Sequence, residues 1–140
     1  SRVLVKGPAT LRVVDHALYW LQDGAVMRID LATDAVTTTQ IDLPPWLNGN
    51  IDGRQWYGCG MAWVPQLRCF FAKPAGPAAE ASSLYRITPD PWRWERITLD
   101  VGTGYGNGLW KKFEWNSRLR CLTWWHNAAG SVYAYRPEGV

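Results

Sequence analysis

Residues 64–72 read VPQLRCFFA and residues 116–124 read NSRLRCLTW, so the chain repeats the phrase Leu-Arg-Cys at a separation of 52 residues. The similarity extends beyond the phrase, since Trp63 aligns with Trp115. Stacked copies of one structural unit place equivalent positions among similar neighbours and therefore select similar side chains. The repeated phrase predicts such a unit, with a period near 50 residues.

The similarity continues on both sides of the phrase. Upstream, YGCG at 57–60 aligns with YGNG at 105–108, and downstream SLYRI at 83–87 aligns with SVYAY at 131–135. The first third, TLRVVDHALYWLQDGAVMRIDL at 10–31, follows the same plan more faintly. We expect three units of short strands with bounds 10–43, 57–99 and 105–136, preceded by a strand over residues 2–6.

Aromatic content is high, with ten Trp, six Tyr and three Phe among 140 residues. Aromatic and β-branched residues recur in short runs that Gly, Pro, Asn and Asp interrupt, whereas no segment keeps apolar residues at helical spacing. The sequence therefore predicts an all-β chain of antiparallel strands.

Charge and cysteine content exclude several classes. The net charge of +3 is spread along the chain with Lys111-Lys112 as the only basic pair, so we expect no nucleic-acid partner. No apolar run reaches the ~18 residues that a membrane-spanning helix needs, so no membrane insertion is expected. Three cysteines without CxxC spacing indicate buried free thiols instead of zinc ligands or a disulfide framework.

Four short antiparallel strands in about 50 residues are typical of a β-propeller blade. The stretches DLATDAV at 30–36 and TPDPWRW at 88–94 resemble the passage from third to fourth strand in kelch-type propellers of the galactose-oxidase-like branch, and Trp94 matches the kelch tryptophan. The kelch double glycine is replaced by Trp20-Leu21, Ala72-Lys73 and Trp124-Trp125. The resemblance implies a β-propeller with about three four-stranded antiparallel blades in this chain.

Three blades cannot close a circle at native packing density, so we expect part of a ring of about six to eight blades. The remaining blades would belong to a longer chain of which this is the C-terminal part, or to a second copy of the chain. A partner protein covering the open ends is the third possibility. The strand over 2–6 would complete a blade.

In a propeller, the loops between blades and those between second and third strands emerge at the same end, where ligand sites gather. Exposed aromatic rings beside polar side chains suit a saccharide, because a ring stacks on the C–H face of a pyranose. We therefore expect a non-catalytic binding or scaffold module, without metal or cofactor, that recognises a saccharide or a protein surface. The candidate ligand residues are Trp46, Asp52, Arg54, Trp56, Tyr57, Tyr105, Asn107 and His126, with Asn48, Asn50 and Asn127 nearby.

The resemblance also leaves an enzymatic alternative, the C-terminal part of a galactose-oxidase-like or glycan-processing enzyme. Copper chemistry of that kind implies two histidines and two tyrosines, whereas the only histidines are His16 and His126, and we place His16 in a turn at the opposite end.

Other features have structural interpretations. We expect Cys69, Cys121 and the strand tryptophans to pack in the core, and the glycines at 102–108 to let the backbone approach the axis. The loop KPAGPAAEASS at 73–83 is expected to be flexible.

Overall fold

The computed structural model describes residues 12–47, 50–51, 54–55, 59–103, 109, 112–125 and 130–140. Within these residues the chain is all-β, as predicted, and its only helices are two short 3-10 helices, Pro45–Leu47 and Ala78–Glu80. No described helix is long and apolar enough to cross a membrane. The strands are β1 (Arg12–Val14), β2 (Ala17–Gln22), β3 (Ala25–Asp30), β4 (Val36–Gln40), β5 (Asn50–Ile51), β6 (Arg54–Gln55), β7 (Gly60–Val64), β8 (Cys69–Lys73), β9 (Ser83–Thr88), β10 (Arg93–Thr98), β11 (Phe113–Asn116), β12 (Cys121–Trp124) and β13 (Tyr133–Tyr135).

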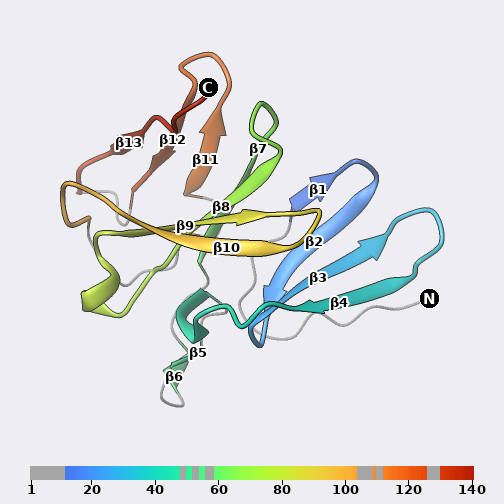
Figure 1. Ribbon diagram of the computed structural model, residues 1–140. Helices are drawn as coiled ribbons and strands as arrows, with labels where there is room; N and C mark the ends of the chain where they lie inside the picture. The colour runs from blue at the N-terminus through green and yellow to red at the C-terminus, as the bar shows by residue number, and fades with distance from the viewer. Residues whose placement is uncertain are drawn as a thin grey trace.

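Three antiparallel sheets lie side by side in Figure 1, in the order of the chain. The first sheet has the order β1-β2-β3-β4, the second contains β7 to β10 in sequence order, and the third has the order β11-β12-β13. Each strand pairs with the next one along the chain, so each sheet is a simple meander. A further two-stranded hairpin, β5-β6, lies in the connection between the first and second sheets.

The repeated phrase marks the same place in the second and third sheets. Arg68 and Arg120 each end a four-residue turn with a left-handed backbone, φ 47° and 53°, and the following cysteine begins the next strand. Cys69 pairs with Val64, and Cys121 pairs with Asn116, in the same register. The equivalence inferred from the sequence is therefore confirmed at the level of the hairpins.

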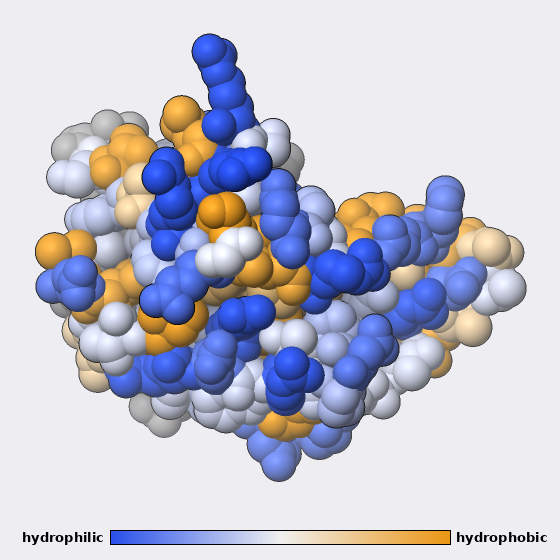
Figure 2. Space-filling model, turned by 45° about the horizontal axis from the view of Figure 1, so that its top comes forward, coloured by the Kyte–Doolittle hydropathy of each residue, from blue (hydrophilic) through white to orange (hydrophobic). Residues whose placement is uncertain are grey.

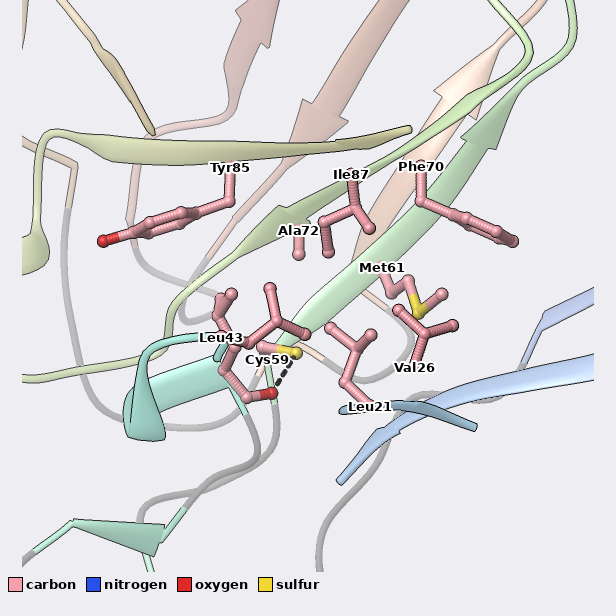
Figure 3. Packing of buried hydrophobic residues seen from close by; sticks show 10 residues of the cluster. Leu21, Val26, Leu43, Cys59, Met61, Phe70, Ala72, Tyr85 and Ile87 are labelled. Atoms are coloured by element: carbon pink, nitrogen blue, oxygen red, sulfur yellow. Dashed lines mark hydrogen bonds between the residues drawn. The ribbon is translucent and has the colours of Figure 1, made fainter. Parts of the chain in front are cut away.

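The middle sheet is buried on both faces. The core between the first and second sheets includes Leu21 and Val26 from one side and Phe70 and Ile87 from the other, as Figure 3 shows. Its lower margin is fixed by Cys59, whose thiol donates a hydrogen bond to the Leu47 carbonyl. A second core joins the other face of the middle sheet to the third sheet, and it includes Val64, Cys69, Phe71, Leu84, Phe113, Leu122 and Trp124.

The first strands of the three sheets come together at one side of the stack. Arg12 of β1 donates to the carbonyl of Met61 on β7, and to the carbonyl of Phe113 on β11 at 3.0 Å. Its guanidinium also pairs with Glu114 at 2.8 Å. At the start of β7, a Cβ on Gly60 would overlap Cβ of Phe113. The chain therefore passes close to β11 at Gly60, whereas most of the glycines at 102–108, for which a close approach to the axis was expected, lie outside the described residues.

Two expected strand ends differ from the structure. The fourth strand of the first unit was expected to reach Leu43 but ends at Gln40, because Asp42 turns the chain with φ 55° and Leu43 enters the core. The second unit was expected to end at Leu99, and its fourth strand, β10, runs from Arg93 to Thr98. The expected strand over residues 2–6 lies outside the described residues.

Candidate functional site

Most of the candidate ligand residues lie outside the described part of the chain, namely Asp52, Trp56, Tyr57, Tyr105, Asn107 and His126, with Asn48 and Asn127. The backbones of Asn50 and Arg54 belong to the β5-β6 hairpin. Only Trp46 has a described side chain. A site at this end of the sheets remains a prediction.

Trp46 takes part in a hydrogen-bonded chain inside the protein. Its indole N–H donates to the Tyr85 hydroxyl at 3.0 Å, and that hydroxyl donates to the Glu80 carboxylate at 2.9 Å. Arg96 lies 3.6 Å from the same carboxylate. Burial raises the pKa of Tyr85 to about 12. The polar atom of Trp46 is therefore already satisfied internally, and its ring packs against the first core.

The loop at 73–83 is structured, which corrects the expectation of flexibility. The Lys73 side chain is fully buried, and its ammonium donates to the carbonyls of Glu80 and Ala81, each at 3.3 Å. Burial lowers the pKa of Lys73 to about 8. The sequence suggested a flexible loop because Ala, Pro and Ser dominate it. In the structure the buried Lys73 ammonium binds the carbonyls of this loop and holds it in place.

A cleft of about 310 Å³ lies between the first and second sheets, at the end that carries the tight turns. Its lining residues are Val14, Asp15, Tyr19, Arg28, Trp63, Arg68, Phe70, Pro89, Asp90 and Trp92. They come from strands of both sheets and from the turns β1-β2, β7-β8 and β9-β10. Figure 2 turns the top of Figure 1, where these turns lie, toward the viewer and shows apolar surface among mainly hydrophilic side chains.

Two cross-strand pairs face each other across this cleft. Tyr19 pairs with Arg28 on the first sheet, and Trp63 pairs with Phe70 on the second. The ring centroids of Tyr19 and Phe70 are 5.2 Å apart, and those of Trp63 and Phe70 are 4.8 Å apart. Trp92 completes the cluster, nearly parallel to Phe70 at 6.2 Å. Phe70 is buried and forms the floor, whereas Tyr19, Trp63 and Trp92 are half-buried walls.

Charged groups surround the rings. The Arg28 guanidinium lies 6.0 Å from the Tyr19 ring centroid and donates to the Tyr19 hydroxyl at 3.2 Å. This hydrogen bond raises the pKa of Arg28 above its usual value. The Arg68 guanidinium lies 5.8 Å from the Trp63 centroid and pairs with Asp15 at 3.4 Å. The rim thus combines aromatic faces with positively and negatively charged side chains that can form hydrogen bonds.

Three turn residues on the rim have left-handed backbones: Asp15 (φ 48°), Arg68 (φ 47°) and Asp90 (φ 60°). Non-glycine residues adopt this conformation at a cost, and such positions are frequent at binding sites.

Sequence reasoning missed this cleft because it placed ligand residues at the other end of the sheets. The available signals were the arginine of the repeated phrase and the Asp90-Pro91-Trp92 turn.

The strand tryptophans have mixed roles. Trp20 is buried, and Trp94 packs on the first core while its indole donates to the Ile41 carbonyl at 2.8 Å. Trp115 packs on the second core. Their expected structural role is confirmed, whereas Trp63 packs on the first core and also lines the cleft. All three cysteines are buried thiols outside any disulfide, as expected.

No protein-family model matches this sequence, and no curated protein matches it. In the described residues, no group of three or more His, Cys, Asp and Glu side chains is placed to hold a metal ion.

Proposed function

We propose that the three sheets are successive blades of a β-propeller, most similar to the kelch-like, galactose-oxidase-like type. Three observations support this: each sheet is a meander, the first strands β1, β7 and β11 adjoin, and Arg12 bonds to both neighbouring strands. A two-sheet sandwich buries one face of each sheet, whereas here the middle sheet packs a core on each face. A ring of this kind takes its other blades from further residues, a second copy or a partner. A stable native monomer of 15.9 kDa would contradict that requirement.

We further propose that the protein is a non-catalytic binding module whose ligand is a saccharide. The observation that carries this is the cleft between the first two sheets, where half-buried rings adjoin arginine and aspartate side chains. Rings of this kind stack on the C–H face of a sugar, while charged groups bond its hydroxyls. A volume of about 310 Å³ lies at the lower limit for ligand pockets, which suits one sugar ring.

A concave site also favours a small ligand over a flat protein surface. Protein interfaces bury ~800 Å² on each partner and present a broad patch. Here the aromatic residues surround a hollow whose floor is the buried ring of Phe70. A group that enters the cleft therefore meets the half-buried rings of Tyr19, Trp63 and Trp92, while Phe70 beneath them stays covered.

The test is binding of the intact protein to a glycan array, followed by calorimetry with the sugars that bind. Trp92→Ala should weaken binding about five- to thirtyfold, since loss of one stacked ring costs on the order of 1–2 kcal/mol. Trp125→Ala is the matched control, because this exposed tryptophan lies outside the cleft. Equal affinities of the Trp92 variant and the unmodified protein would show that the cleft is not the sugar site.

A further inference from the structure

The cleft already contains cations over two of its rings. Arg28 covers Tyr19, and Arg68 covers Trp63, at distances at which a guanidinium is attracted to a ring face. A cationic group could stack on either of these two rings only by displacing the arginine that covers it. The arrangement therefore disfavours an ammonium group stacked on Tyr19 or Trp63.

The arginines also have carboxylate partners. Arg68 pairs with Asp15 at 3.4 Å, and Arg28 lies 3.7 Å from Asp30. The Asp30 carboxylate accepts hydrogen bonds from the backbone N–H groups of Ala32 and Thr33, which hold its pKa below the usual value. It therefore stays ionised beside Arg28 at neutral pH. Both described arginines of the cleft thus have a carboxylate counter-charge, so an acidic ligand gains little attraction from them.

Two polar groups of the cleft have no partner among the residues that the structure describes. The Asp90 carboxylate makes no hydrogen bond or ion pair with any described residue, and it is exposed on the rim. The indole N–H of Trp92, two residues further along the turn, likewise has no acceptor among the described residues. The Asp90 carboxylate thus offers an acceptor, and the Trp92 indole offers a donor, at a ring over which no described arginine lies.

We infer that the cleft takes an uncharged pyranose, with the sugar's C–H face on Trp92 and neighbouring hydroxyl groups bonded to the Asp90 carboxylate. This inference rests on the proposed saccharide function and adds the charge class of the ligand and the residue that recognises its hydroxyls. A carboxylate accepts hydrogen bonds from two neighbouring hydroxyl groups at once, and a neutral sugar supplies such a pair. An aromatic ring alone does not distinguish one arrangement of hydroxyl groups from another. Asp90 sets the preference, and Trp92 supplies the contact area.

The experiment compares three probes built on one sugar ring: a methyl pyranoside, the corresponding uronic acid and the corresponding amino sugar. Calorimetry on the intact protein should give the highest affinity for the neutral methyl pyranoside. Asp90→Asn should reduce that affinity about tenfold, since hydrogen bonds to a charged group are the stronger class. Asparagine tolerates the left-handed backbone at this position, so the variant should keep the fold, which its far-ultraviolet spectrum and unfolding midpoint will check.

The matched control is Asp100→Asn, an aspartate outside this cleft, which should leave the affinity unchanged. Tightest binding of the uronic acid or of the amino sugar would overturn the inferred charge class and leave the saccharide function standing. An unchanged affinity in Asp90→Asn would overturn the role of this carboxylate. If none of the three probes binds, and the glycan array is also negative, both the inference and the saccharide function fail.

Discussion

Gly60→Ala is the sharpest test of how the second and third sheets pack. An added Cβ would overlap Cβ of Phe113 and lie 2.7 Å from its Cγ and 3.1 Å from Cβ of Leu109. Carbon atoms normally approach no closer than about 3.5 Å, so the contact with Cγ is about 1 Å too short. Rotation of the Phe113 ring leaves its Cβ in place, so β7 and β11 must separate.

Overpacking of a core costs about 1–3 kcal/mol, and we expect Gly60→Ala at the upper end, about 3 kcal/mol. With a urea dependence of about 1.5 kcal/mol per molar, the unfolding midpoint should fall by about 2 M. Gly102→Ala is the matched control, because the nearest atom to an added Cβ there is Cβ of Ala81 at 4.0 Å. That substitution should change the midpoint little.

A second variant tests whether the loss of stability comes from the contact with Phe113 or from alanine at position 60 in general. Phe113→Gly removes the two atoms nearest to the new Cβ and leaves only Cβ of Leu109 at 3.1 Å, at the cost of a cavity. Once position 113 is glycine, adding alanine at position 60 should cost much less than it does in the unmodified protein. If Gly60→Ala and Gly102→Ala have equal midpoints, β7 and β11 do not run side by side, and the reasoning about the sheet stack is refuted.

Three further predictions concern buried or bridging polar groups. Arg12→Met should lower the free energy of unfolding by about 2 kcal/mol or more in chemical denaturation, since it leaves two carbonyl acceptors without their charged donor; an unchanged midpoint would contradict the link between the first strands. For Lys73, whose folded pKa of about 8 lies below the ordinary value of 10.5, stability should rise as pH increases from about 8 to 10.5, because only the unfolded chain then keeps the proton. In Lys73→Met this part of the pH dependence should disappear, and a slope equal to that of the unmodified protein would disprove the assignment. Burial raises the pKa of Cys59 to about 12, so its thiol should react with Ellman's reagent only at the rate of unfolding, and rapid labelling of the native protein would be inconsistent with its burial.

The local features of the fold follow from short stretches of sequence. Asp23-Gly24 makes a tight turn because glycine accepts φ 80°, and the alternation around it gives the hairpin of β2 and β3. The phrase Leu-Arg-Cys predicts equivalent hairpins because a turn and the strand after it depend mainly on neighbouring residues. For this reason the strand class and the equivalence of the repeated hairpins could be inferred from the sequence, while strand ends such as Gln40 depended on where the chain enters the core.

The cleft between the first and second sheets could not be inferred in the same way. Its rim residues Asp15, Arg68 and Asp90 belong to three different turns, and nothing within any one turn shows that the others lie nearby. Trp63 has the same sequence signature as Trp115, yet Trp63 lines this cleft while Trp115 packs on the second core. The difference arises because the two sheets meet different neighbours.

The sequence by itself determined that this protein is built from antiparallel hairpins with aromatic cores, because hydrophobic alternation and turn chemistry act over a few residues. Only the tertiary structure decided which aromatic rings are covered by another sheet and which stay open beside Arg28 and Asp90. The physical reason is that sheet-on-sheet packing is set by the shapes of two surfaces together. For this reason, similar strand residues pack in the core at one place and line a cleft at another.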